Sequence, residues 1–111
     1  MKKELKPSGI GLELPVLQAA YKLGLDAQGS NIRKAVDHAL GRSISPGAIY
    51  TVLDRLAAKG WVKSYMGEST DGRKGNRRKY FRVTGEGEAA LDHARRTMVT
   101  LGWLVPKAVI S

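Results

Sequence analysis

The sequence contains no cysteine, which excludes disulfide bonds, thiolate zinc sites and cysteine nucleophiles. Long apolar runs are also missing: none approaches the ~18 residues that a membrane span needs, and no signal-peptide core is present. These absences predict a soluble cytoplasmic protein without a membrane segment. Acidic residues are scarce, with ten Asp and Glu against nineteen Lys and Arg, so the net charge is +9. A chain this basic favours a polyanionic partner.

The sequence also offers little material for an enzyme. Its two histidines, His38 and His93, are isolated and lie on outer, polar faces of expected helices. No paired carboxylates, metal-ligand spacing or phosphate-binding loop stands out. We therefore expect no catalytic residues, no metal site and no cofactor. The 111 residues, 42% of them hydrophobic, instead suit one small folded domain with its own core.

Positive charge is concentrated in one segment. Between positions 72 and 82 there are six cations and no acid: Arg73, Lys74, Arg77, Arg78, Lys79 and Arg82. Such a run is often only a solvated or disordered stretch, but strand-like residues on both sides favour a binding role here. A smaller basic group predicts a flexible N-terminal arm over 1–9, which either touches a polyanion or keeps this end in solution. That group consists of Lys2, Lys3 and Lys6.

Apolar residues recur at helical spacing in three segments, which predicts helices over about 14–23, 30–40 and 46–59. Ser30 or Gly29 can cap the second helix, and Ser45 can cap the third, with Pro46 at its first helical position. Glycines 24, 41 and 60 follow the three helices and end them. The expected core positions are Val16, Ala19, Ala20 and Leu23, then Ile32, Ala35, Val36, Ala39 and Leu40, then Ile49, Val52, Leu53, Leu56 and Ala57.

A hairpin and a last helix complete the chain. We expect strands over 61–66 and 77–83, joined by a loop, with Phe81 and Val83 on one face and Tyr80 and Arg82 on the other. Thr84 can cap a helix that ends at Pro106. This helix either packs on its own domain or, as we favour, pairs with a second copy. Its heptad-like seam is Leu91, Ala94, Met98, Leu101 and Val105.

This order of elements is typical of a winged helix-turn-helix. The expected fold is mainly α with a small β-hairpin (α+β), followed by a C-terminal dimerisation helix. The expected parts are the arm over 1–9, the DNA-binding domain over 10–84, the dimerisation helix over 85–106 and a tail over 107–111. In such a fold the third helix enters the major groove of double-stranded DNA, while the cations of the hairpin lie along phosphates.

The outer face of the third helix then supplies the candidates for groove contact: Ser45, Gly47, Ala48, Tyr50, Thr51 and Arg55. Thr51 and Arg55 can reach base edges, although Arg55 could instead pair with Asp54 or another acid. Tyr50 either donates to a phosphate or packs half-buried. The candidates for phosphate contact in the hairpin are Arg73, Lys74, Arg77, Arg78 and Lys79.

Two stretches resemble the PadR-like transcriptional regulators. The first, over 45–62, begins Ser-Pro-Gly-Ala-Ile-Tyr and is similar to the Pro-Gly-Thr-x-Tyr segment and Leu-x-x-Leu-x-x-x-Gly-Leu-Val motif of that family. The second, Arg-Arg-Lys-Tyr-Phe-Arg-Val-Thr-Gly-Glu-Gly over 77–87, is similar to the family's wing exit. Departures from the pattern are Ala48 for Thr, Gly85 for Pro and Gly-Ser-Asn-Ile over 29–32 for Gly-Tyr-Glu-Ile.

The resemblance implies a homodimeric repressor that is joined through its terminal helices and binds a roughly palindromic operator. The chain is similar to the short branch of the family, some members of which bind flat aromatic compounds against a Trp on the last helix. Trp103 stands at that place, where it either packs in the interface or serves as a ligand platform. A sensor of small aromatic molecules and a non-specific nucleic-acid-binding module are the alternative functions.

Overall fold

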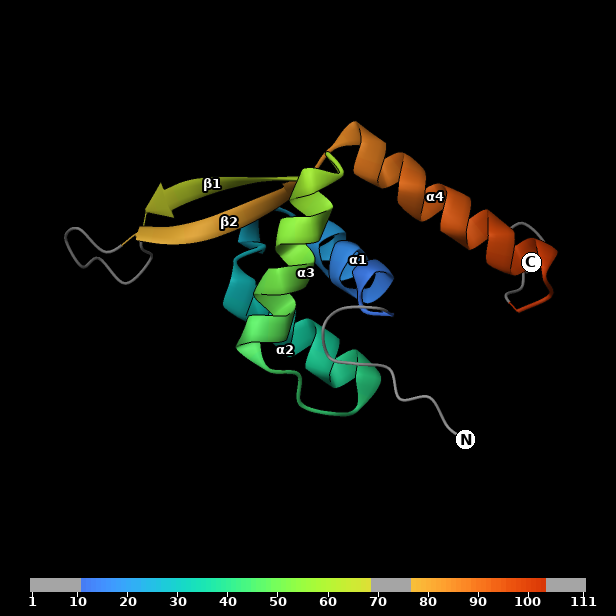
Figure 1. Cartoon of the computed structure of the whole chain (residues 1–111), viewed down its shortest axis with the longest axis horizontal. Coiled ribbons are helices and arrows are strands. Elements are labelled where there is room, and N and C mark those ends of the chain that lie inside the picture. The colour runs from blue at the N-terminus through green and yellow to red at the C-terminus, as the bar shows by residue number, and fades with distance from the viewer. Residues whose placement is uncertain (1–10, 69–76, 104–111) are drawn as a thin grey trace.

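Four α-helices and one β-hairpin make up the computed structural model, which describes residues 11–68 and 77–103. Helices α1, α2 and α3 pack together beside the base of the hairpin, and α4 extends away from them on the opposite side (Figure 1). The winged helix-turn-helix arrangement expected from the sequence is confirmed. The elements are α1 (Glu13–Leu23), the 3-10 turn η1 (Gly24–Asp26), α2 (Gly29–Leu40), α3 (Pro46–Ala58), β1 (Val62–Glu68), β2 (Arg77–Val83) and α4 (Gly85–Thr100).

The core lies among α1, α2, α3 and the base of the hairpin. Four of the five expected positions of α3 are fully buried, as are two of α2: Ile49, Val52, Leu53 and Leu56, then Ile32 and Val36. The prediction was wrong for Ala39, Leu40 and Ala57, which are exposed. Residues outside the predicted stripes also enter the core: Leu12, Leu17, Ala27 and Ile44.

The turn between α2 and α3 is closed by one carboxylate. Asp37 Oδ1 accepts the Ile44 N–H at 2.8 Å, and its Oδ2 lies 3.4 Å from Arg33 Nη1. Arg33 also donates to the Ile44 carbonyl at 3.3 Å. Ser45 then caps α3 by accepting the Ala48 N–H at 3.1 Å, as the sequence predicted. Hydrogen bonds from α2 to Ile44 and from Ser45 to the first turn of α3 therefore fix the direction in which α3 leaves the turn.

The hairpin is longer on its first strand than expected. The register runs from Val62 opposite Val83 to Glu68 opposite Arg77, so Gly67 belongs to β1 and not to the loop. Tyr80 faces away from Phe81 as predicted but is buried, because its ring covers Gly67 and stacks at 5.6 Å on that of Tyr65.

A third segment pairs with the other edge of β2. The Phe81 N–H donates to the Ala27 carbonyl at 2.8 Å, and Gln28 forms an isolated bridge with Tyr80. Gln28, and neither Ser30 nor Gly29, is the N-cap residue of α2, and no side chain caps this helix. Pairing with β2 holds Gln28 in an extended conformation, which moves the start of α2 to Gly29.

Helix α4 is anchored at its first turn. Thr84 caps it as predicted, accepting the Gly87 N–H at 3.0 Å while donating to the Gly60 carbonyl at 2.6 Å. The prediction that α4 ends at Pro106 was wrong, because it ends at Thr100. Gly102 adopts a left-handed conformation, and the Trp103 N–H bonds back to the Met98 carbonyl at 2.8 Å. This is a Schellman termination, which glycine favours.

Some predicted parts lie outside the described residues: the arm with Lys2, Lys3 and Lys6, the seam residue Val105, and the tail over 107–111. Among the helices that the structure does describe, none is long and apolar enough to cross a membrane.

Candidate nucleic-acid interface

The outward face of α3 carries most of the residues expected there. Exposed side chains or backbone are found at Ser45, Gly47, Tyr50, Thr51 and Arg55. Ala48 was predicted on this face, and that prediction was wrong: it is only 6% exposed. Its position is one helical turn before Val52, which places it on the buried stripe. Ala48 therefore belongs to the core and is removed from the set of contact residues.

Tyr50 lies between α3 and the hairpin. Its ring centroid is 6.4 Å from that of Phe81, and its hydroxyl end lies over Gly29 at the start of α2. The side chain is 40% exposed, which matches the half-buried packing that the sequence left open. A glycine is needed at position 29, because an added Cβ would overlap the Tyr50 ring and hydroxyl. Tyr50 thus joins the second helix, the third helix and the hairpin at one point.

Replacing Gly29 with Ala is expected to destabilise the protein by about 1–3 kcal/mol, because the new methyl group must displace the Tyr50 ring. Urea unfolding measures this change. Gly47→Ala is the matched control, since no atom lies within 4 Å of the Cβ it would add. At position 47, inside α3, alanine should leave the free energy of unfolding unchanged or raise it. Equal stability of the two variants would contradict the packing role of Tyr50.

Arg55 is available for a ligand. Within residues 11–68 and 77–103 its side chain forms no ion pair or hydrogen bond, either with the neighbouring Asp54 or with an acid elsewhere. Thr51, one helical turn before it, is also exposed. The structure therefore leaves the guanidinium and the hydroxyl together on the outer side of α3.

The register of the hairpin separates its side chains into two faces. We call the face that packs on the helices the inner face; it carries Val62, Ser64, Met66, Lys79, Phe81 and Val83. The outer face carries Lys63, Tyr65, Gly67, Arg78, Tyr80 and Arg82. Sequence reasoning missed Lys63 as a member of the basic surface, although its alternation with Tyr65 was visible.

The predicted phosphate-contact residues fall in different places. Lys79 lies on the inner face with its Nζ 5.8 Å from the Phe81 ring centroid. Arg78 is exposed on the outer face. The backbone of Arg77 belongs to β2, but its side chain lies outside the described atoms, as do Arg73 and Lys74 entirely.

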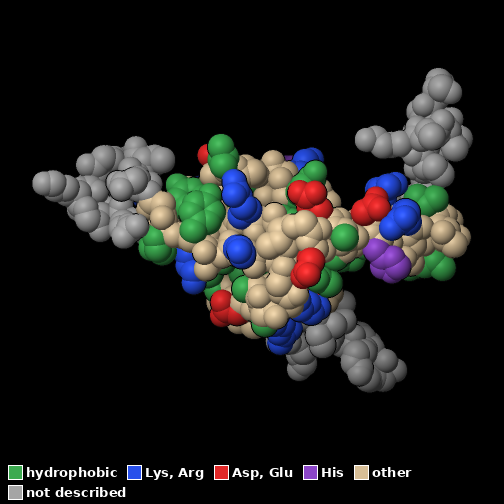
Figure 2. All heavy atoms as spheres, turned by 90° about the horizontal axis from the view of Figure 1, so that it is seen from above, with side chains coloured by type: hydrophobic (Ala, Val, Ile, Leu, Met, Phe, Trp, Pro, Cys, Tyr) green, Lys and Arg blue, Asp and Glu red, His purple; other side chains and the backbone are tan. Residues whose placement is uncertain are grey.

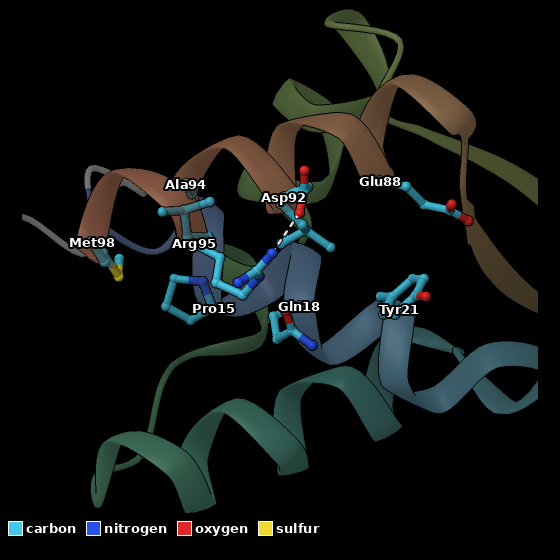
Figure 3. Close-up of a pocket in the computed structure, with 10 residues that line it drawn as sticks. Pro15, Gln18, Tyr21, Glu88, Asp92, Ala94, Arg95 and Met98 are labelled. Carbon is cyan, nitrogen blue, oxygen red and sulfur yellow. Dashed lines mark hydrogen bonds and ion pairs between the residues drawn. The ribbon is translucent and has the colours of Figure 1, made fainter. Parts of the chain in front are cut away.

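A groove of about 550 Å³ separates α4 from α1 (Figure 3). Three residues of the predicted seam, Leu91, Ala94 and Met98, line it and are half-buried. Leu14 and Pro15 of α1 form the facing apolar side, which sequence reasoning missed because it required knowing which helix α4 crosses. The only residue of α4 that is fully buried in the described structure is Gly87.

Charged side chains border this groove. Asp92 accepts a hydrogen bond from Arg95 at 2.9 Å and lies 3.2 Å from Arg96. The Arg95 hydrogen bond and the charge of Arg96 lower the pKa of the Asp92 carboxyl. Beyond the groove, Leu101 and Trp103 are exposed at the end of α4, Trp103 by 71%.

The comparisons with known proteins agree with this geometry. The model of the transcriptional regulator PadR-like family matches residues 22–93. None of the curated proteins matches the chain. Among solved structures, a PadR family transcription regulator from Clostridium difficile R20291 is 27% identical, with a TM-score of 0.66 over 82% of this chain and 90% of that one.

Two further solved structures are similar. A Streptococcus transcriptional regulator is 27% identical, with a TM-score of 0.70 over 83% of this chain and 85% of that one. A PadR family transcriptional regulator from Eggerthella lenta DSM 2243 is 26% identical, with a TM-score of 0.61 over 91% of this chain and 89% of that one. The chain therefore belongs to the PadR-like family of transcriptional regulators, as a DNA-binding winged helix-turn-helix protein and not as an enzyme.

Proposed function

We propose that this regulator is a repressor that binds a pseudo-palindromic operator in double-stranded DNA as a homodimer. The observation that carries the proposal is the outer face of α3, where Thr51 and Arg55 are exposed and Arg55 has no intramolecular ion pair in the described structure. The buried stripe on the other side of α3 holds these two side chains outward. An α-helix fits the major groove, where each base pair presents a distinct pattern of donors and acceptors.

Each part of the interface has its own role in this proposal. Arg55 reads guanine with its two-pronged guanidinium, and Thr51 contacts a neighbouring base edge. Ser45 and Gly47, which are short and exposed, let the start of α3 approach the DNA backbone closely. The cations of the hairpin contact phosphates and supply affinity without sequence information: Arg73, Lys74, Arg77, Arg78 and Lys79.

The groove between α1 and α4 supports the homodimer. Leu91, Ala94 and Met98 recur at the spacing of a helix seam but are only half-buried, so a second α4 can cover them. Leu101, the C-cap residue of α4, is exposed at the end of the same seam. A two-fold dimer presents two copies of α3, which fits an inverted repeat in the DNA.

Met98→Asp is expected to convert the dimer into a monomer, because it places a charge in the apolar seam. Size-exclusion chromatography with light scattering measures the mass. Thr97→Asp is the matched control, since it adds the same charge to the neighbouring, exposed position of α4. A monomeric wild-type protein at DNA-binding concentrations, or a dimeric Met98→Asp variant, would contradict this interface.

Selection from a random pool of duplex DNA at physiological salt tests the function as a whole. We expect enrichment of an inverted repeat whose half-sites lie about one helical turn apart. Binding without enrichment, or a preference for RNA or single strands, would instead support a non-specific nucleic-acid-binding module. Run-off transcription from a promoter overlapping the selected site then tests repression, and a rise in transcript would show an activator.

The exposure of Trp103 favours a second candidate function, the sensing of flat aromatic compounds at the dimer interface. Planar aromatics are expected to quench the tryptophan fluorescence of the wild-type protein but not that of Trp103→Ala. The chain has two tryptophans, and Trp61→Phe is the control because only Trp103 then remains to be quenched. Failure of a varied panel to quench, or quenching that survives in Trp103→Ala, would rule out this site.

A further inference from the structure

The outer face of the hairpin is basic and aromatic, and it is opposite the face on which Tyr50 of α3 packs. Lys63, Arg78 and Arg82 are exposed on it, and Tyr65 is half exposed between them, stacked on Tyr80. No acid belongs to this face in the described register. Figure 2, seen from above, shows Lys and Arg side chains in blue beside a green patch next to the hairpin tip.

Two of these cations are placed against each other. The register sets Lys63 directly opposite Arg82, and like charges at such a position destabilise a hairpin. Glu88 lines a small hollow beside Arg82, yet neither Arg82 nor Lys63 forms an ion pair within the described residues. A like-charged pair without a counter-charge stores repulsion in the free protein, and an anion that contacts both side chains would relieve it.

This face lies on the opposite side of the hairpin from α3. Tyr50 of α3 packs toward Phe81, on the inner face, and Lys79 lies over the same ring. A duplex held by the outer side of α3 therefore meets the inner face and the tip of the hairpin. Lys63 and Arg82 lie at the end of the outer face next to the helices, turned away from that duplex and open to a second ligand, whereas Arg78 lies near the tip, which meets the operator.

We infer that the outer face of the hairpin binds the phosphate backbone of a second DNA duplex while α3 holds the operator. Lys63 and Arg82 contact phosphate oxygens, Arg82 with its planar fork, and the Tyr65 hydroxyl donates to the same backbone. The face favours a duplex over a single strand, because the tyrosine pair is already stacked and is closed to an inserted base. The regulator would thereby bridge two DNA segments.

The inference rests on the proposed function, and a bridging assay tests it separately. The selected operator is fixed to beads and saturated with protein, so that both copies of α3 are occupied. A labelled duplex of unrelated sequence is then added, and a labelled single strand is used in a parallel arm. We expect the duplex to be retained, and Lys63→Ala/Arg82→Ala to lower its affinity roughly 60-fold at 0.1 M salt, from two lost phosphate contacts.

Operator affinity and thermal stability provide the internal controls. The double variant should bind the operator as wild type does, and its Tm should be equal or higher because the repulsion is gone. Lys22→Ala, which removes an exposed cation from α1, should leave retention unchanged.

Three results would overturn the inference: no retention by the wild-type complex, equal retention by the double variant, or retention of the single strand alone. Parallel loss of operator affinity would also overturn it, by assigning the outer face to the operator. If the selection yields no operator, the proposed function fails. The same assay with two unrelated duplexes then still decides whether Lys63 and Arg82 hold a second one.

Discussion

Replacing Arg77, Arg78 and Lys79 together with Ala is expected to weaken the binding of every duplex by about the same factor. Each phosphate contact releases counterions and contributes ~0.9 to the slope of log affinity against log salt concentration. Three lost contacts lower the slope by about 2.7, which is roughly a 500-fold loss of affinity at 0.1 M salt. Because phosphates carry no sequence information, operator and random duplexes should lose equally.

Fluorescence anisotropy titrations over a range of salt concentrations measure both the affinity and its slope. Arg77→Lys/Arg78→Lys is the control, since it keeps the charges and should retain most of the affinity. Unfolding must also be followed, because Lys79 lies over the Phe81 ring. A slope that does not change in the triple variant would show that these cations do not contact phosphates.

Arg55→Lys is expected to weaken operator binding selectively. Lysine keeps the positive charge but loses the fork that matches guanine, so discrimination falls by about 1–3 kcal/mol for each half-site. Affinity for random duplexes should change little. Thr51→Ala should cause a smaller loss of affinity that is also selective for the operator, because it removes the contact of Thr51 with a neighbouring base edge.

Competition between operator and random duplexes in one titration separates these effects. Arg55→Ala completes the series, because it removes the charge as well and should lower both affinities. Equal loss on both duplexes in Arg55→Lys would exclude Arg55 from base readout. Arg55 would then contribute only to the non-specific electrostatic attraction of DNA.

Local signals in the sequence account for the start of each element that a side chain caps. Ser45 and Thr84 were identified as caps, and both accept the expected backbone N–H. A cap is specified by residues within one helical turn, which is why it can be predicted without the tertiary structure. The end of α4 was predicted wrongly although its signal was present, because Gly102 and not Pro106 terminates the helix.

Other positions depended on neighbours that are distant in the chain. Tyr80 is buried and Leu40 is exposed because of which neighbouring elements cover them, and periodicity alone does not specify those neighbours. Periodicity states which residues share a face but not where a neighbouring element ends. Tyr80 is covered because it lies across Gly67, and Gly29 is required because Tyr50 lies over it.

The sequence by itself determined the winged helix-turn-helix order, the basic character of the hairpin and the family resemblance that the comparisons confirmed. These features follow from composition, spacing and short motifs, which are properties of the chain alone. Only the tertiary structure decided that α4 crosses α1 to leave an apolar groove, and that Lys63 opposes Arg82 on the hairpin face turned away from α3. Such juxtapositions arise from strand register and helix crossing, where residues far apart in sequence come into contact.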